Sequence, residues 1–148
     1  MRYGIIGALD EEIALVKEQM TEVKEHKLYG RSFYTGRIGK KEIVLVCCGV
    51  GKVNAALFAN AAIREFHAEA VINIGIAGAI GAGIGVMDVV LSTEAAFHDQ
   101  DEVMVKYYPF RRSFQADPAL LALAQMACDN TREGRFRIDC KRRPICNG

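Results

Sequence analysis

The sequence predicts an α/β fold, because segments with the character of buried strands alternate with segments of helical spacing. Residues 3–9 form an apolar run of strand length, and a helical spacing of apolar residues follows it directly. Residues 44–46 are apolar without a break, which is typical of a strand buried on both faces. The alanine-rich residues 53–66 then predict a helix. We therefore expect helices layered on a sheet, with some antiparallel pairing among the middle strands.

The other elements of the first half follow from spacing and from glycine. Ile13, Val16 and Met20 mark one face of the first helix. Two extended segments follow, at about residues 27–35 and residues 41–48. The turn between these two segments is expected at the glycines, which are Gly36 and Gly39.

The second half of the chain predicts two more strands and one more helix. The strands are expected at residues 70–74 and 86–91. The last helix is expected at residues 118–128, because Asp117 is a favourable N-cap and Pro118 suits the first helical position.

Length and composition indicate one domain with a sizeable core. The chain has 148 residues, of which 51% are hydrophobic, and its net charge is +1. A charge so close to zero gives no global field that favours nucleic acid or a membrane surface. Residues 70–87 carry no charged side chain, but their five glycines and Asn73 make a poor membrane span. We expect neither nucleic acid nor a membrane as a partner.

The cysteines and the amino terminus indicate a cytoplasmic protein. The five cysteines form an odd set without a CxxC pair, which predicts neither a disulfide framework nor a zinc site. Cys47 lies inside an apolar run, where a reduced and buried thiol is usual. The first apolar run is too short for a signal peptide, and three acids close it.

An acidic cluster, Asp10-Glu11-Glu12, directly follows the first strand. Acids in a first helical turn complement the helix dipole, and this interpretation is favoured for Asp10 and Glu11. Open α/β sheets also bind their ligands at the carboxyl ends of their strands. Glu12 is therefore a candidate functional residue, to be judged together with the rest of the chain.

Two glycine loops follow later strands, and neither is a standard nucleotide motif. Residues 49–52 (GVGK) lack the glycine and the hydroxyl residue that a phosphate loop needs, since Val46 and Val53 stand at those positions. Residues 75–78 (GIAG) depart from GxGxxG. Each loop either allows tight packing or lets a flat ligand approach the main chain closely.

A lone histidine and an aromatic cluster complete the candidates. His98 stands beside Asp99 and Asp101, but one histidine is a weak metal site, and a hydrogen-bonded histidine is the favoured interpretation. The aromatic cluster suits a dimer contact, a lid over an apolar ligand, or plain core, and it comprises Tyr107, Tyr108, Pro109 and Phe110.

Three segments considered together are more specific. These are residues 4–12 (GIIGALDEE), 49–56 (GVGKVNAA) and 72–78 (INIGIAG), and residues 89–95 (VVLSTEA) and 97–99 (FHD) continue the pattern. In order and spacing the pattern resembles the amino-terminal part of the 5′-methylthioadenosine/S-adenosylhomocysteine nucleosidases, within the nucleoside phosphorylase-like superfamily. The resemblance covers the chain from its first residue to about residue 130.

The resemblance implies a three-layer α/β/α fold with a mixed central sheet. It implies a cytoplasmic homodimer that needs no metal and no organic cofactor. The implied activity is hydrolysis of the N-ribosidic bond of 5′-methylthioadenosine, S-adenosylhomocysteine and related adenosine derivatives, with release of adenine for methionine salvage.

The resemblance also implies roles for individual residues. Glu12 would be the base that activates water on the face of the sugar opposite the leaving adenine, as in inverting glycosidases. Ala8 and Leu9 would lie beside it, and Val50 would touch the 5′-alkylthio group. The ribose and the base would be lined by Ile76, Ala77 and Gly78. An apolar Ile76 offers nothing to phosphate, which agrees with water as the nucleophile.

Three alternatives stay open from the sequence. The chain could be a purine nucleoside phosphorylase or a futalosine hydrolase on the same scaffold. It could be a non-catalytic module that binds a nucleoside or forms a dimer. It could also be an incomplete product without a function of its own.

The end of the chain departs from the family pattern. No position matches the family's aromatic residue that stacks on adenine, its ribose-binding glutamate or its base-protonating aspartate. We expect residues 1–137 to be the amino-terminal part of a single nucleosidase domain that is truncated. We expect residues 138–148 to be an atypical tail, frame-shifted or disordered, with neither strand nor helix over residues 139–144. Because truncation leaves a sheet edge or an apolar face uncovered, we expect self-association.

Overall fold

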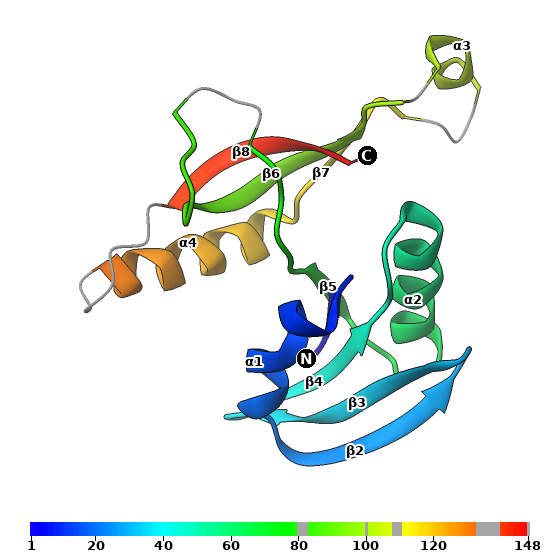
Figure 1. Ribbon diagram of the computed structural model, residues 1–148, viewed down its shortest axis with the longest axis vertical. Helices are drawn as coiled ribbons and strands as arrows, with labels where there is room; N and C mark the ends of the chain where they lie inside the picture. Colours follow the sequence, from blue (N-terminus) through cyan, green and yellow to red (C-terminus); the bar gives the residue numbers. More distant parts are fainter. Residues whose placement is uncertain (80–82, 100, 108–110, 133–139, 148) are drawn as a thin grey trace. The chain divides into compact units, whose positions relative to one another are not determined.

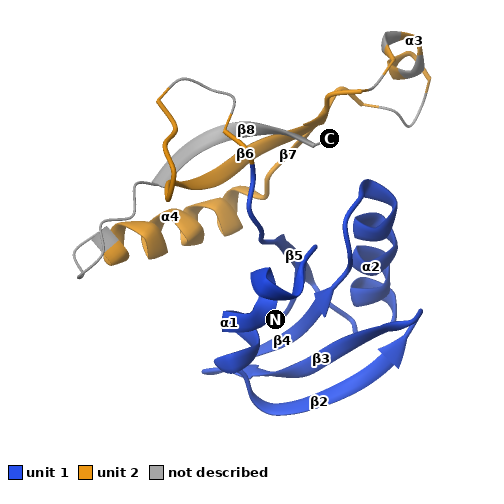
Figure 2. Cartoon of the chain, in the orientation of Figure 1, with its two compact units in different colours: residues 1–77 blue, residues 78–148 orange. Residues whose placement is uncertain are grey.

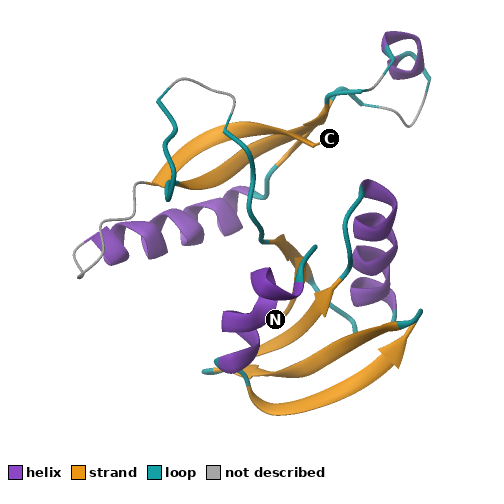
Figure 3. Ribbon diagram, viewed as in Figure 1, coloured by secondary structure: helices purple, strands orange, loops and turns teal. Residues whose placement is uncertain are grey.

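A computed structural model of the chain describes residues 1–79, 83–99, 101–107, 111–132 and 140–147 (Figure 1). The chain forms two compact units, residues 1–77 and residues 78–148 (Figure 2). Both units combine strands with helices, as Figure 3 shows, and each is described by itself. No helix in the described ranges is long and apolar enough to cross a membrane.

The first unit is built on a mixed sheet of five strands in the order β2-β3-β4-β1-β5. The strand β1 runs parallel to both of its neighbours, β4 and β5, whereas β3 is antiparallel to β2 and to β4. Two helices complete the unit. The elements are β1 (Arg2–Gly7), α1 (Asp10–Glu18), β2 (Thr21–Leu28), β3 (Arg31–Ile38), β4 (Lys41–Cys47), α2 (Lys52–Arg64) and β5 (Ala70–Asn73).

The two helices of this unit cover opposite faces of its sheet. Adjacent residues of a strand point to opposite faces, so Phe33 and Val46 face one side and Tyr34 and Leu45 the other. On the first side Phe33, with no exposed surface, packs in one cluster with residues of α2 such as Phe58. On the second side Leu45 packs in another cluster with residues of α1. The expected three-layer α/β/α arrangement with a mixed sheet is confirmed.

The second unit contains a sheet of three strands in the order β7-β6-β8, against which α4 packs. Asp117 caps α4 as expected, because its Oδ1 accepts hydrogen bonds from the amides of Ala119 and Leu120, both at 2.9 Å. The elements are β6 (Val89–Phe97), α3 (Glu102–Val105), β7 (Ser113–Gln115), α4 (Pro118–Arg132) and β8 (Cys140–Asn147).

The segment expected as one strand at residues 27–35 is instead the turn of a hairpin between β2 and β3. Tyr29 and Gly30 both have positive φ, 49° and 73°, and this pair of conformations makes a tight two-residue hairpin turn. The pattern concealed the turn because tyrosine is uncommon at positive φ. Gly36 lies inside β3, and the turn between β3 and β4 consists of Gly39 and Lys40.

Two further boundaries differ from the expectation. The helix α1 ends at Glu18, so Met20 is buried in the core cluster from a position after the helix. The strand expected at residues 86–91 begins only at Val89. The reason is a turn, in which the amide of Gly85 donates to Asp88 Oδ2 at 2.7 Å and Met87 has a φ of 71°.

The expectation that residues 139–144 form neither strand nor helix is wrong. Residues 140–147 form β8, which pairs in parallel with β6 at the edge of the sheet. Strand pairing uses main-chain groups, so a charged edge strand is allowed. Pro144 donates no amide hydrogen, and it pairs next to a register shift in β6 between Ser92 and Glu94, where the ladder is already irregular.

The cysteines also depart in part from the expectation. Cys47 and Cys48 are free thiols, but Cys128 is disulfide-bonded. Cys47 is a free thiol as expected, whereas the disulfide at Cys128 was not expected, because the spacing of cysteines in a sequence does not reveal which of them the fold brings together. The aromatic cluster lies partly outside the described residues, since of its members only Tyr107 is described.

Candidate active site

Glu12 lies where β1 ends and α1 begins, and its carboxylate is turned back onto the main chain. Its Oε2 accepts hydrogen bonds from the amides of Ala8 at 2.7 Å and Leu9 at 3.0 Å. A glutamate at the third helical position commonly reaches back in this way to the amides that precede a helix. One carboxylate oxygen is thereby fixed within the first turn of α1.

The other carboxylate oxygen is held by the loop that follows a different strand. Glu12 Oε1 accepts a hydrogen bond of 2.9 Å from the amide of Ile76, in the loop that follows β5. The parallel pairing of β1 with β5 brings this loop close, and the ladder extends beyond the strand, because the amide of Ile74 donates to the carbonyl of Ile6 at 2.9 Å. Three main-chain donors from two adjacent strand ends therefore orient one side chain.

These hydrogen bonds favour the ionised form of Glu12. They lower the pKa of the Glu12 carboxyl below its ordinary value, the Ile76 amide most and then the amides of Leu9 and Ala8, while partial burial acts in the opposite direction. An ionised carboxylate can accept about four hydrogen bonds, two on each oxygen. With two on Oε2 and one on Oε1, an acceptor position remains on Oε1 for a water molecule or a hydroxyl group.

Two glycines make room for this carboxylate. A Cβ atom added to Gly75 would lie 2.6 Å from Glu12 Oε1, and one added to Gly7 would lie 2.6 Å from Ile13 Cγ2 and 3.2 Å from Glu12 Cβ. Contacts this short require a neighbour to move, so any side chain at Gly75 displaces the carboxylate itself. Gly7 and Gly75 thus have a defined steric role beside Glu12.

Exposed apolar side chains follow the three strands next to this carboxylate. Leu9 follows β1, Val50 follows β4 and Ile76 follows β5, with 39%, 72% and 83% of their surface exposed. Since β4, β1 and β5 are parallel neighbours, these residues share one edge of the sheet. The amide of Cys48 donates to the carbonyl of Gly7 at 2.8 Å, which ties the β4 loop to β1. We call Leu9, Val50 and Ile76 the apolar rim.

The remaining sequence candidates are distributed as follows. Ala77 is exposed at the end of the first unit, and Gly78 begins the second unit, where an added Cβ would meet nothing within 4 Å. Asp10 and Glu11 are exposed in the first turn of α1, as the dipole interpretation expects. Among the described residues no group of three histidine, cysteine or acidic side chains could hold a metal ion, and His98 is part of no such group.

One residue near this edge was missed from the sequence. Arg31 begins β3, and its guanidinium lies beside Gly49 in the loop that follows β4. Nothing in the local sequence of Arg31 indicates a site. Only the antiparallel pairing of β3 with β4 brings Arg31 to this edge. Predicting that these two segments pair as a hairpin would have placed Arg31 opposite the end of β4.

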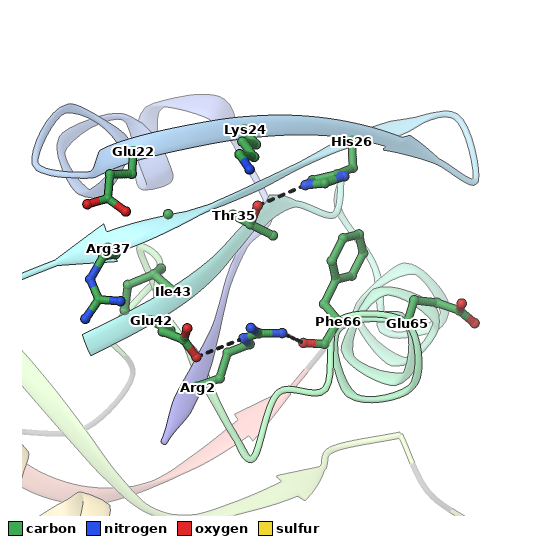
Figure 4. Close-up of a pocket in the computed structure, with 11 residues that line it drawn as sticks. Arg2, Glu22, Lys24, His26, Thr35, Arg37, Glu42, Ile43, Glu65 and Phe66 are labelled. Carbon is green, nitrogen blue, oxygen red and sulfur yellow. Dashed lines mark hydrogen bonds and ion pairs between the residues drawn. The ribbon is translucent and has the colours of Figure 1, made fainter. Parts of the chain in front are cut away.

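A cavity of about 420 Å³ lies at the other end of the sheet (Figure 4). It is lined near the start of β1 by Arg2, whereas Glu12 follows the end of that strand. Arg2 Nε lies 3.4 Å from Glu42 Oε2, and His26 Nε2 lies 2.9 Å from Thr35 Oγ1. These four polar side chains form two separate pairs, and no residue of the expected site lines the cavity.

Sequence comparison identifies the family. A model of the phosphorylase superfamily matches residues 2–145, nearly the whole chain. The chain belongs to the phosphorylase superfamily. It is similar to the 5′-methylthioadenosine/S-adenosylhomocysteine nucleosidase of Staphylococcus carnosus, with 39% identity over 129 residues, which cover 82% of this chain and 56% of that protein. The resemblance found in the sequence is thereby confirmed.

Solved structures of this superfamily agree with the sequence comparison. A nucleosidase of the same name from Neisseria meningitidis was solved in complex with methylthio-immucillin-A and is 37% identical to this chain, with a TM-score of 0.90. The match covers 99% of this chain and 64% of the Neisseria chain. The Colwellia psychrerythraea enzyme in complex with adenine is 31% identical, with a TM-score of 0.91, and the match covers 100% of this chain and 62% of the Colwellia chain. The chain thus spans 56% to 64% of the length of these three relatives.

Replacing Gly75 by alanine should raise the pKa of Glu12 towards its ordinary value of 4.5, because the new Cβ pushes Oε1 away from the Ile76 amide. The pKa is measured by following the side-chain carboxyl carbon of Glu12 by NMR during a pH titration. Gly78→Ala is the matched control, since its Cβ meets nothing within 4 Å. An unchanged Glu12 pKa in Gly75→Ala would contradict the steric role of Gly75.

Glu12→Gln should make the free energy of unfolding less dependent on pH. Because the folded-state pKa of Glu12 is lowered, its carboxylate stabilises the fold above the ordinary value of 4.5, and this contribution is lost as the pH falls through the lowered folded-state pKa. Urea denaturation should therefore show the largest deficit of the variant at neutral pH and a shrinking deficit below pH 4.5. A deficit that stays constant with pH would contradict this assignment. The control is Glu11→Gln in the same helical turn.

Proposed function

We propose that the chain carries the water-activating part of a nucleosidase site, which hydrolyses the N-ribosidic bond of 5′-methylthioadenosine, S-adenosylhomocysteine and related adenosine derivatives. The observation that carries this proposal is the Glu12 carboxylate, fixed by three main-chain amides with an acceptor position left over. Similar proteins named as nucleosidases for these two substrates support it.

The chemistry of the reaction fits this geometry. Cleavage of a ribosyl bond passes through an oxocarbenium-like state, and a water molecule attacks the face of the sugar opposite the leaving base. A carboxylate that stays ionised can accept a hydrogen bond from that water at all neutral pH values. Because both Glu12 oxygens are fixed, the water is oriented before the bond breaks, which reduces the entropic part of the barrier.

The apolar rim supports water rather than phosphate as the nucleophile. A phosphate ion would approach the ionised Glu12 as a like charge, and Ile76 has no polar side-chain group to receive it. In this proposal Val50 touches the 5′-alkylthio group, and Leu9 and Ala8 lie beside the base Glu12. Ile76, Ala77 and Gly78 line the ribose and the base.

The proposed site needs groups beyond Glu12. By the resemblance, the acid that protonates adenine and the glutamate that binds the ribose have no counterpart in these 148 residues. We propose that residues 1–137 are the amino-terminal part of one nucleosidase domain. Because catalytic groups act as a unit, water activation alone should give only a fraction of a complete site's rate.

We further propose a cytoplasmic homodimer that acts in methionine salvage without a metal or organic cofactor and binds neither nucleic acid nor a membrane. The surface of α2 supports the self-association. Val53 and Leu57 stand one helical turn apart, with 82% and 42% of their surface exposed. Exposed apolar side chains on one helix face are typical of a contact with another chain.

Purified chain should release adenine from 5′-methylthioadenosine, and Glu12→Gln should lower the rate about a hundredfold to ten-thousandfold, the usual contribution of a general base. Adenine is measured by chromatography in phosphate-free buffer and again with added phosphate. Glu11→Gln is the control and should keep the rate of the wild type.

Three outcomes would contradict the proposed function. Release that depends on phosphate would identify a phosphorylase. Failure of the wild-type chain both to release adenine and to bind 5′-methylthioadenosine in calorimetry would exclude a nucleoside site. Binding without release would show a nucleoside-binding module instead of a working enzyme.

The double variant Val53→Glu, Leu57→Glu should convert a dimer to a monomer, because two acids on the same helix face would repel their copies across the contact. Sedimentation velocity measures the change. Leu15→Glu, which alters a residue of α1 with 70% of its surface exposed, is the matched control and should leave the dimer intact. A wild-type chain that sediments as a monomer would contradict the proposed self-association.

A further inference from the structure

The guanidinium of Arg31 is packed against the loop that carries Val50. Its Nη2 atom would lie 2.7 Å from a Cβ on Gly49, so the absence of a side chain at Gly49 leaves the space that the guanidinium occupies. Asn54 Nδ2 would lie 3.3 Å from the same added Cβ. This nitrogen donates a hydrogen bond of 2.8 Å to the carbonyl of Val50. Arg31 therefore lies next to one end of the apolar rim.

The guanidinium of Arg31 forms no ion pair or hydrogen bond within the first unit. Arg31 is exposed, and none of the hydrogen bonds or ion pairs among the described residues involves its guanidinium. A guanidinium has five donors in a planar fork, a shape that matches a carboxylate. Its free donors are thus available to an anionic group that approaches from solvent.

Arg31 and Glu12 belong to the same edge of the sheet. Burial mainly raises the pKa of the Cys48 thiol, and on this thiol Arg31 and Glu12 act in opposite directions, Arg31 lowering the pKa and Glu12 raising it. Burial also mainly raises the pKa of the Cys47 thiol, which Arg31 lowers and Asp10 raises. Charges that influence the same thiol lie within a short range of one another. The edge therefore carries a negative group at β1 and a positive group at β3, with the β4 loop between them.

This order along the edge matches the order of groups in one of the proposed substrates. If Glu12 faces the reacting carbon and Val50 touches the 5′-sulfur, a substituent that continues past Val50 reaches Gly49 and Arg31. In S-adenosylhomocysteine the substituent is a short chain that ends in an amino acid, with a carboxylate at its tip. In 5′-methylthioadenosine it is a methyl group, which ends at Val50.

We propose that Arg31 is a specificity-determining residue, which binds the carboxylate of an amino-acid-type 5′ substituent and so favours S-adenosylhomocysteine over 5′-methylthioadenosine. This inference rests on the proposed function. An exposed ion pair is weak, and a hydrogen-bonded carboxylate–guanidinium pair is somewhat stronger, so the preference due to Arg31 should be about threefold to tenfold. It should decrease with added salt.

Calorimetric titration of the whole chain tests this inference with three ligands: S-adenosylhomocysteine, 5′-methylthioadenosine, and the decarboxylated analogue that keeps the amino group but lacks the carboxylate. Arg31→Gln should weaken binding of S-adenosylhomocysteine about threefold to tenfold and leave the other two affinities unchanged. Arg64→Gln, an exposed arginine at the far end of α2, is the control and should bind all three ligands like the wild type.

Each other outcome overturns the inference in a recognisable way. Equal S-adenosylhomocysteine affinity in the wild type and in Arg31→Gln, with 5′-methylthioadenosine still bound, overturns the role of Arg31 and leaves the proposed function standing. An equal loss for all three ligands in Arg31→Gln indicates a structural role only. If the wild type binds neither nucleoside, the proposed function itself fails, and the inference fails with it.

Discussion

The candidate site depends on three main-chain hydrogen bonds to one carboxylate. Glu12 is held on one oxygen by the amides of Ala8 and Leu9 and on the other by the amide of Ile76. A side chain held by amides needs no side-chain partner, so its neighbours are free to be small or apolar. This explains why glycines and apolar residues surround the proposed base.

Such an arrangement is possible because three parallel strands lie side by side. The loops after β4, β1 and β5 meet at one edge of the sheet, and each contributes a short segment with exposed apolar side chains. The antiparallel strand β3 adds its first residue, Arg31, to the same edge. The edge therefore carries a negative side chain, apolar side chains and a positive side chain in that order.

The sequence was informative about elements whose signals are local and less so about those that depend on pairing. Asp117 predicted the start of α4, because an N-cap acts within one turn of a helix. The hairpin at Tyr29 escaped prediction because tyrosine rarely adopts positive φ. The strand β8 escaped because its charged residues and Pro144 gave no pattern, whereas main-chain pairing with β6 alone defines it.

The order of residues along the chain was enough to predict the fold class and the superfamily and to make Glu12 a candidate, because apolar periodicity and the spacing of the three glycine-containing segments are properties of the sequence. How Glu12 is held depends on the three-dimensional pairing of the strands. The amide of Ile76 is 64 residues away from it in sequence, and the need for glycine at Gly75 arises from a contact across two strands. The position of Arg31 beside Gly49 was decided in the same way, since strand pairing sets distances that residue order leaves open.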